Sequence, residues 1–433
     1  MKLKPSILII LSVFTLVFPT KTKGQDESFL DRFGIDLHGY VDVRGGTRTQ
    51  DDPNQRNTSL AEARLQTDIT RTGDEATLQV RADFLYDYVP EDTDLDIEDG
   101  TGEIDLREAN IAFSPFDFLD MKVGRQILTW GTGDLLFIND LFPKDWQSFF
   151  IGRDEAYLKA PSDAVFISLF PAFANINIVY MPRFDSDRYI RGERLSFWNP
   201  MLGRRSGRDS IVDADKPDDW FRDDEIAIRI YRNIDGYEIV LYGYNGFWKS
   251  PEGMDPVSLK ATFPKLWAYG ASVQGPLGNG LFNLEVGHYV SDEDQSGNDP
   301  FVPNSELRLL AGFEREIAKN LTAKFQYYLE YMQDYDNYKD NLPGSRKPRD
   351  EDRHVLTLRI TKLALNQNLT LSFFGYYSPS DQDSYLRPMI KYKVTDSWLV
   401  MVGGNIFIGK ENYTFFGQFE KNNNIYGAVR YSF

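Results

Sequence analysis

Residues 321–330 have the sequence LTAKFQYYLE, in which apolar and polar side chains alternate. Successive residues of a β-strand point to opposite faces of the sheet. One face of this segment carries Leu321, Ala323, Phe325, Tyr327 and Leu329, and the other carries Lys324, Gln326, Tyr328 and Glu330. The pattern predicts a strand with one face against an apolar medium and the other against water.

The same alternation recurs in segments of about ten residues from Ile35 to the C-terminus. Short connections are expected at 72–75, 114–118, 171–174, 235–236, 275–280, 318–320, 366–368 and 395–397. Long, charged connections alternate with them, at 45–60, 89–103, 131–163, 185–223, 249–265, 291–304, 334–353, 378–384 and 409–422. A transmembrane barrel has tight turns at one end and long loops at the other, whereas a soluble sandwich has no reason for this order. We therefore predict an all-β fold at residues 25–433, an antiparallel up-and-down barrel of 18 strands with short periplasmic turns and long extracellular loops.

The composition agrees with a barrel and excludes several other classes of protein. Among 433 residues, 65 Asp and Glu oppose 48 Lys and Arg, and the net charge of -17 argues against nucleic acid as a partner. The absence of cysteine excludes thiol catalysis and disulfide scaffolds. A mean hydropathy of -0.43 without long apolar runs excludes a bundle of membrane helices. The 31 Phe, 24 Tyr and 7 Trp suit aromatic girdles at the membrane interfaces, for which Tyr88, Phe247, Trp248 and Trp267 are among the candidates.

Residues 1–24 are typical of a secretory signal peptide. Lys2 and Lys4 precede the apolar stretch 7–18, and the small residues Thr22 and Gly24 resemble a cleavage site. An uncleaved anchor helix is the alternative, but twelve apolar residues are too few to span a bilayer. We expect export, with cleavage before Gln25.

The last three residues, Tyr431-Ser432-Phe433, resemble the aromatic C-terminal signature of outer-membrane β-barrels. The stretch from Val123 to Gln126, followed by Trp130-Gly131, is similar to segments of Gram-negative porin-like proteins, among them the 18-stranded alginate-export type. The resemblance implies the outer membrane of a Gram-negative bacterium as location. It also implies lipid, lipopolysaccharide and the barrel assembly machinery as partners, with Tyr431 and Phe433 as assembly signals.

The connection at 131–163 is rich in large apolar side chains, which would be costly to expose to water. We expect it to fold inward and narrow the lumen, with Trp130, Trp146 and Phe149 shaping the constriction. The alternative is an external loop that packs on its neighbours.

Seven arginines lie within residues 183–208 of this acidic chain. Arginine binds carboxylates and phosphates through a planar fork, so a loop of this kind inside the lumen would attract anions. We predict that three arginines of this region select anions, namely Arg191 and Arg194 in the loop 185–223 and Arg183 just before it. On the barrel wall, the predicted selectivity residues are Arg64, Arg81 and Arg125. The alternative is pairing with the acidic residues 213–224 or with lipid phosphates.

The acidic loop 92–103 places carboxylates at positions that resemble a calcium loop, namely Asp92, Asp94, Asp96 and Glu103. It lacks the glycine at the sixth position and the flanking helices of an EF-hand, so a solvated external loop is the simpler interpretation. We predict no cofactor and no other metal site.

Only three histidines are present, and His38 alone is expected to face the lumen beside carboxylates. A lumen hydrolase that uses His38 is therefore the weakest hypothesis, and we predict that the protein is not an enzyme. The favoured function is a channel for passive passage of small hydrophilic solutes, anions among them. The alternative is a closed barrel with a structural or adhesive role at the cell surface. Solute identity, direction of transport and oligomeric state stay open.

Overall fold

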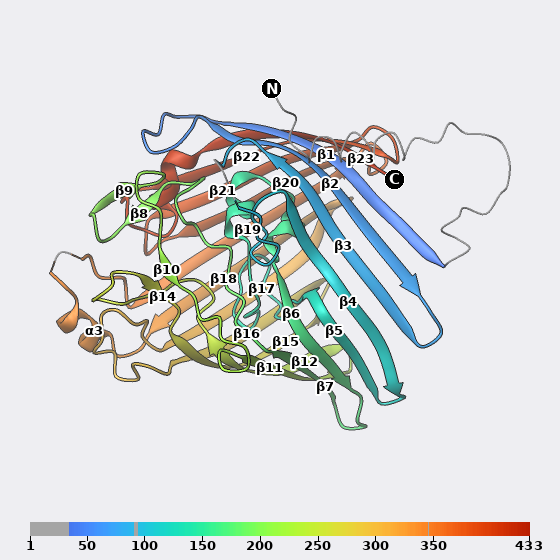
Figure 1. The fold of residues 1–433 in the computed structure, drawn as a ribbon, viewed down its shortest axis with the longest axis horizontal. Helices are drawn as coiled ribbons and strands as arrows, with labels where there is room; N and C mark the ends of the chain where they lie inside the picture. The colour runs from blue at the N-terminus through green and yellow to red at the C-terminus, as the bar shows by residue number, and fades with distance from the viewer. Residues whose placement is uncertain (1–33, 91–93, 345) are drawn as a thin grey trace.

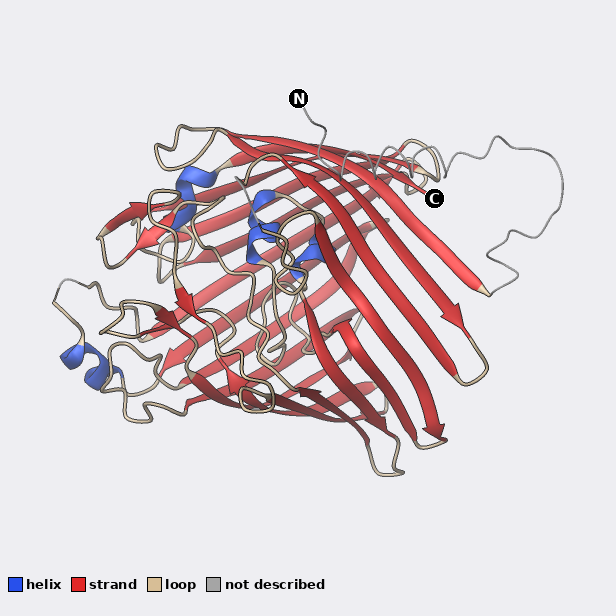
Figure 2. Cartoon of the chain, in the orientation of Figure 1, coloured by secondary structure: helices blue, strands red, loops and turns tan. Residues whose placement is uncertain are grey.

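The computed structural model describes residues 34–90, 94–344 and 346–433. The proposed signal peptide lies outside these residues. The chain forms a closed antiparallel barrel of 18 strands, so the predicted fold class is confirmed (Figures 1 and 2).

Strands β1 to β7 span Ile35–Arg48, Thr58–Thr72, Ala76–Asp87, Ile104–Phe116, Leu119–Ile127, Pro161–Leu169 and Asn175–Met181. Strands β11, β12, β15 and β16 span Glu225–Ile234, Tyr237–Phe247, Lys265–Leu277 and Gly280–Ser291, and β17 to β20 span Glu306–Ala318, Leu321–Met332, Asp352–Ala364 and Leu369–Ser378. Strands β21 to β23 span Asp383–Lys393, Trp398–Gly409 and Asn424–Ser432.

The barrel closes between the first and last strands of the chain. β1 and β23 pair antiparallel, with Val41 opposite Tyr431 and Arg48 opposite Asn424. Every strand of the large sheet therefore has a partner on both sides, as the interior of a bilayer requires of backbone donors and acceptors.

Each of the eight predicted short connections is a hairpin turn at one end of the barrel, on the right in Figure 1. The turn between β11 and β12 shows why the sequence turns there. Asp235 and Gly236 both have positive φ, 52° and 87°. An Asp-Gly pair of this kind forms the type I′ turn whose twist matches that of the flanking strands.

The outer face of the barrel is apolar. In β22, Val400, Val402, Ile406 and Ile408 point outward and are exposed, while the alternate residues Met401 and Phe407 are buried. The two-residue period thus separates a lipid-compatible surface from the interior.

The interior is more apolar than the predicted water-facing surface. Phe247 and Trp248 are buried inside the barrel, so the expectation that they belong to an outer aromatic girdle is wrong. Val179, Leu266 and Leu310 also point inward and join one hydrophobic cluster with residues of the connection after β5. These inward apolar positions exist because a chain segment, and not only water, lies against the wall there.

Several connections differ by a few residues from the predicted bounds, and two of these differences concern segments of the site. β5 ends at Ile127 and β6 begins at Pro161, so residues 161–163 belong to a strand and not to the inward connection. Proline is tolerated at the first position of a strand, where its missing N–H disturbs the ladder least. The long connection after β7 covers 182–224 and contains three short strands.

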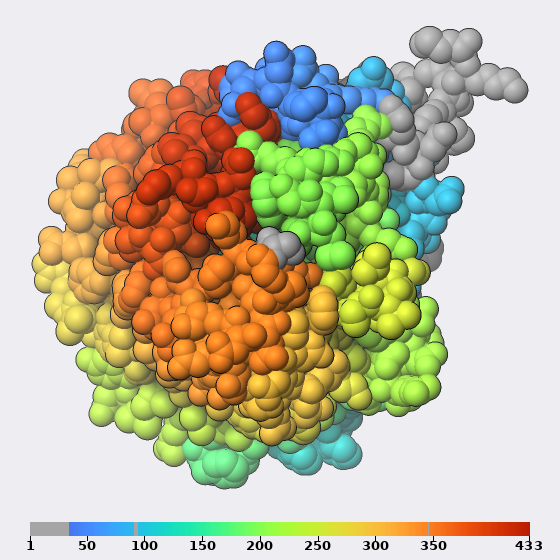
Figure 3. All heavy atoms as spheres, turned by 90° about the vertical axis from the view of Figure 1, so that its left-hand side faces the viewer, coloured from blue at the N-terminus to red at the C-terminus, as the bar shows by residue number. Residues whose placement is uncertain are grey.

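The long loops gather over the other end of the barrel, and loops from distant parts of the chain meet there (Figure 3). Their short elements are β8 (Phe197–Asn199), β9 (Arg204–Ser206), β10 (Ala214–Asp215), β13 (Gly253–Met254), β14 (Ala261–Thr262), α3 (Tyr335–Asn341) and η3 (Gly417–Asn422). Among the described residues, no helix has both the length and the apolar content needed to cross a bilayer.

Candidate functional site in the barrel lumen

Residues 128–160 lie inside the barrel at mid-height and form a floor across it, which we call the inward segment. It contains α2 (Trp146–Ile151) and η2 (Glu155–Leu158). Asp145 caps α2 by accepting a hydrogen bond from the Ser148 N–H at 2.7 Å. Gly152 ends the helix with φ at 95°, and a Cβ atom there would lie 2.3 Å from the Tyr426 ring. Glycine is thus required both by the positive φ of the backbone and by the close approach of the Tyr426 ring on the wall.

One wall holds the inward segment by its backbone. The buried Glu285 carboxylate of β16 accepts hydrogen bonds from Thr132 N at 2.7 Å and from Asn139 N at 2.9 Å. Gln326 of β18 accepts from Asp134 N at 2.7 Å and donates to Asp134 O at 2.9 Å. Because both partners are wall residues, this half of the segment is fixed to β16 and β18.

The adjoining stretch of wall, from β19 through β21 and β23 to β1, holds the inward segment by ion pairs. We call its five cations the basic arc: Arg44, Arg359, Arg387, Lys391 and Arg430. Arg359 donates to Asp134 at 2.7 Å and to Glu155 at 3.1 Å, and Glu155 lies 3.5 Å from Arg387. Asp154 lies 3.4 Å from Arg430, 3.8 Å from Lys391 and 4.0 Å from Arg44.

Aromatic packing completes the floor. Phe149 meets Tyr385 edge to face at a centroid distance of 5.7 Å, and Phe150 packs against Phe407 at 5.4 Å and Phe419 at 5.0 Å. These rings bring α2, β21, β22 and η3 into one apolar core. The side chains of this connection thus lie inside the barrel, on the side that its apolar content predicted.

A cavity of about 1010 Å³ lies between the floor and the long loops, and we call it the outer vestibule. One side of it carries the charge strip, a run of six residues in which acidic and basic side chains alternate. These residues are Glu306, Arg308, Glu330, Arg349, Arg353 and Asp381. The strip spans β17, β18, β19 and two loops.

Aromatic side chains are prominent in the rest of the lining, together with aliphatic and charged residues. Trp146 and Phe149 stand on its floor, Phe415 and Phe416 meet edge to face at 4.8 Å, and Trp198 and Tyr413 lie nearer the loops. Trp146 is fixed by a hydrogen bond from its Nε1 to Asp187 at 3.0 Å. The lining thus combines a dense charge strip with several aromatic rings.

The three residues expected to shape the constriction occupy two places. Trp146 and Phe149 line the outer vestibule. Trp130 lies behind the floor, where its ring packs against Phe142 at 5.0 Å and Tyr242 at 6.2 Å. Trp130 supports the floor from the wall side.

The three wall arginines predicted to select anions are held by carboxylates of the wall. The pairs are Arg64 with Asp83, Arg81 with Asp68 and Glu108, and Arg125 with Asp163. Arg64 also stacks on the Tyr157 ring of η2, with its guanidinium carbon 4.1 Å from the ring centroid. These arginines lie beside the inward segment on the β2 to β6 side.

The three loop arginines are paired as well, with other partners than the acidic residues 213–224. The pairs are Arg183 with Glu98, Arg191 with Glu193, and Arg194 with Asp87. None of the six predicted selectivity arginines belongs to the described lining of the outer vestibule. Its arginines are instead Arg308, Arg346, Arg349 and Arg353, and Lys144, Lys249, Lys347 and Lys410 also line it. Strand parity placed Arg308 inside the barrel, but no sequence signal indicates that the loop residues Arg349 and Phe415 join it.

The chain end is part of the barrel seam. The Tyr431 ring lies 5.0 Å from Trp398, and Phe433 exchanges two backbone hydrogen bonds with Gly39 at 3.0 and 3.1 Å. A Cβ atom on Gly39 would lie 2.7 Å from the Phe433 ring. The role of Tyr431 and Phe433 as assembly signals stays a prediction.

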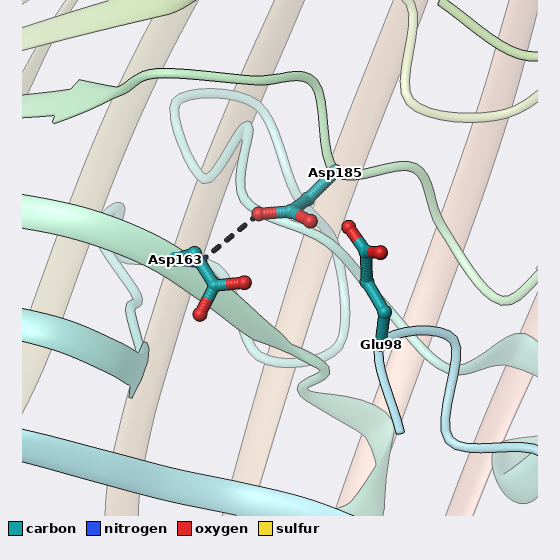
Figure 4. Close-up of side chains that lie close together, drawn as sticks. All are labelled: Glu98, Asp163 and Asp185. Atoms are coloured by element: carbon teal, nitrogen blue, oxygen red, sulfur yellow. Dashed lines mark hydrogen bonds between the residues drawn. The ribbon is translucent and has the colours of Figure 1, made fainter. Parts of the chain in front are cut away.

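The predicted calcium loop contributes one residue to a different carboxylate cluster. Asp92 lies outside the described residues, Asp94 and Asp96 are exposed, and Asp96 accepts hydrogen bonds from the backbone of its own turn. Glu98 instead approaches Asp163 and Asp185, with oxygens of all three within 4.8 Å of one another (Figure 4).

Cations already surround this cluster. Arg183 pairs with Glu98, Arg125 lies 3.1 Å from Asp163, and Lys249 donates to the Asp185 carbonyl at 3.1 Å. Its oxygens are of the kind that calcium prefers, but these neighbours balance its charge. We assign no metal to it.

His38, the residue of the hydrolase hypothesis, lies on β1 near the short-turn end, is exposed and faces Asp68 in the register with β2. This position is remote in sequence and height from the outer vestibule, whose lining contains no histidine among the described residues.

No family model and no curated protein matches this chain. Solved structures do resemble it. The Acinetobacter baumannii protein OccAB1 aligns over 95% of this chain and 98% of its own, with a TM-score of 0.55 and 10% identity. OccD3 (OpdP) of Pseudomonas aeruginosa aligns over 92% and 91%, with a TM-score of 0.52 and 12% identity. OccK5 (OpdH) of the same organism aligns over 92% and 97%, with a TM-score of 0.52 and 10% identity. At these identities the similarity establishes a shared barrel fold.

Proposed function

We propose that this chain is a passive channel of the Gram-negative outer membrane for hydrophilic solutes, with a preference for anions. The outer vestibule carries the proposal, because it is a large charged and aromatic cavity inside a closed barrel whose outer face is apolar. The barrel architecture that it shares with OccAB1 is compatible with this role.

Side chains below the floor are in contact with solvent, which favours the channel function and not the alternative of a closed structural barrel. The side chains of Glu155 and Lys391 are 40% and 28% exposed, and that of Arg359 is 23% exposed. Water therefore reaches the short-turn side of the inward segment as well as the outer vestibule. Among the described residues the floor separates the two compartments, and part of it is held by partly exposed ion pairs, which are weak.

The basic arc supports the preference for anions. Its five cations face four carboxylates, of which three belong to the inward segment (Asp134, Asp154 and Glu155) and one, Asp42, to the wall. One net positive charge remains beside the floor, where a permeating ion would pass closest to the wall. We place the preference here and not at Arg183, Arg191 and Arg194, whose charges are paired elsewhere.

Single-channel recording of the refolded protein in a planar bilayer tests both the channel function and the preference for anions. We expect stable open steps and a reversal potential that indicates anion preference in a salt gradient. The double variant Arg359→Gln with Lys391→Gln should shift that potential toward cations, and Lys324→Gln, a lumen lysine outside the arc, should leave it unchanged.

Two other results would redirect the assignment. If the preference disappears only when Arg183, Arg191 and Arg194 are neutralised, the loop is the selective element. If a folded barrel never opens, the structural or adhesive alternative takes the place of the channel.

A further inference from the structure

The charge strip of the outer vestibule is electrically balanced and continuous. Arg308 lies 2.6 Å from Glu306, and Arg349 lies 3.4 Å from Glu306 and 2.7 Å from Glu330. Arg353 lies 3.3 Å from Glu330 and 2.7 Å from Asp381. Three guanidinium groups and three carboxylates thus follow one another without interruption. The six residues together carry no net charge, so the strip offers many hydrogen-bond donors and acceptors with little net attraction for ions of either sign, and Glu252 adds a carboxylate beside Arg349.

The strip keeps hydrogen-bonding capacity for a ligand. Each guanidinium has five N–H donors and each carboxylate about four acceptor positions, more than the pairs within the strip use. The Arg349 side chain is 48% exposed although it bridges two carboxylates. Adjacent donors and acceptors along the strip match neighbouring hydroxyl groups, each of which both donates and accepts.

Exposed aromatic faces lie in the same cavity. Phe415 is 45% exposed, and the Arg353 guanidinium stacks over it at 4.6 Å, so this ring adjoins the charge strip. Tyr413 and Trp198 lie 6.3 Å apart near the loops, and Trp146 continues the aromatic lining at the floor. An aromatic face carries negative partial charge, which attracts polarised C–H groups of a ring without net charge.

We propose that the outer vestibule binds neutral polyhydroxylated solutes, that is, short carbohydrates, before they pass the floor. This rests on the proposed channel function and names a solute class for it. The hydroxyl groups of the solute donate to Glu330 and Asp381 and accept from Arg349 and Arg353. The apolar ring faces of the solute lie against Phe415 and the neighbouring aromatic rings. Ion preference, set by the basic arc below the floor, is a separate property of the same channel.

Tryptophan fluorescence of the refolded protein measures this binding directly, because Trp146, Trp198 and Trp248 line the cavity. Maltotriose serves as the neutral probe and trigalacturonate as its acidic counterpart of equal ring number. We expect saturable binding of maltotriose that is insensitive to salt, and no tighter binding of trigalacturonate.

Two pairs of variants locate the site. Phe415→Ala and Arg349→Gln should each weaken maltotriose binding at least fivefold. The matched controls are Phe221→Ala and Arg222→Gln, exposed loop residues outside the vestibule lining, which should bind as the unaltered protein does. Each variant is checked for a folded barrel by whether it resists unfolding in detergent without heating.

The outcomes separate this proposal from the channel itself. Absence of saturable maltotriose binding, or equal binding by all four variants, would overturn the carbohydrate site. Tenfold tighter, salt-sensitive binding of trigalacturonate would overturn the neutral solute class. Block of the ionic current by maltotriose in a bilayer is the expected parallel result. Binding without any current would preserve the site and remove the channel function.

Discussion

Gly152 shows how one residue connects the inward segment to the barrel wall. Its positive φ and the 2.3 Å approach of a hypothetical Cβ to Tyr426 mean that any side chain there must strain the backbone and displace the ring. We expect Gly152→Ala to lower the free energy of unfolding by about 2–4 kcal/mol.

Gly203 provides the matched control for this substitution. It also has a positive φ, at 61°, but no described heavy atom lies within 4 Å of its hypothetical Cβ. Gly203→Ala should therefore cost only the backbone term, about 1 kcal/mol. Urea-induced unfolding followed by tryptophan fluorescence compares the two, and equal losses would contradict the tight contact with Tyr426.

Asp185 gives a prediction on pH. Burial raises the pKa of this loop carboxyl to about 6, Asp163 and Glu225 add to the rise, and Lys249 opposes it. The folded state thus binds a proton more tightly than the unfolded state, whose pKa is about 4. The resulting loss of stability is fully present above pH 6 and disappears as the pH falls toward 4.

Asp185→Asn should therefore stabilise the barrel at pH 8, by at most about 3 kcal/mol, and have little effect near pH 4. The exposed Asp218→Asn in the same loop is the control, with no expected difference between the two pH values. Thermal unfolding followed by circular dichroism measures both. An Asp185→Asn effect that does not change with pH would show that the carboxyl is not the cause.

At the scale of elements, the inward segment depends on Glu285 of β16. This carboxylate accepts hydrogen bonds from Thr132 N, Thr132 Oγ1, Asn139 N and Asn139 Nδ2. Glu285→Gln replaces one accepting oxygen by a donor, which faces N–H groups and cannot bond them. The first half of the segment should then move more freely.

We expect Glu285→Gln to give larger and noisier open steps in single-channel recordings than the unaltered protein. Glu238→Gln, also on the lumen side of the wall but paired with Arg229, is the control. Unchanged current noise in the first variant would mean that the segment is held by the ion pairs of the basic arc and not by β16.

The elements were predictable from the sequence to different degrees. The strands and turns follow from a period of two and from pairs such as Asp235-Gly236, which are local signals. The apolar content of the connection after β5 indicated its inward position, because Phe142, Phe149 and Phe150 would be costly in water. The partners of the arginines could not be predicted. Arg194 pairs with Asp87 across 107 residues of chain, a contact that only the closed barrel creates.

At the scale of the whole molecule, the site arises from loops and walls that the sequence does not relate. Arg308 and Glu330 belong to strands, and their inward direction follows from alternation. Arg349 and Phe415 belong to two different long loops, and periodicity contains no information on where such loops fold. The fold class was thus fully accessible from sequence, whereas the vestibule required the positions of the loops.

Phe433 gives a prediction at this scale. Phe433→Ala should lower the amount of folded barrel recovered from the outer membrane several-fold, because the ring packs over Gly39 at the seam and is the proposed assembly signal. Phe221→Ala controls for loss of an exposed phenylalanine. Comparison with refolding in detergent, where no assembly machinery is present, separates the two roles. An equal loss in both settings would indicate a packing role alone.

The backbone hydrogen bonds between Phe433 and Gly39 join positions almost 400 residues apart. β1 can therefore pair with its second neighbour, β23, only after the whole chain has been synthesised. Until that moment two strand edges are open, and each is a template for pairing with another chain. Closing so long a loop is also the entropically costliest and slowest contact of the molecule. The unclosed sheet is therefore the aggregation-prone species during folding, and a chaperone that shields β1 would protect it more than one that shields any hairpin in the middle of the chain.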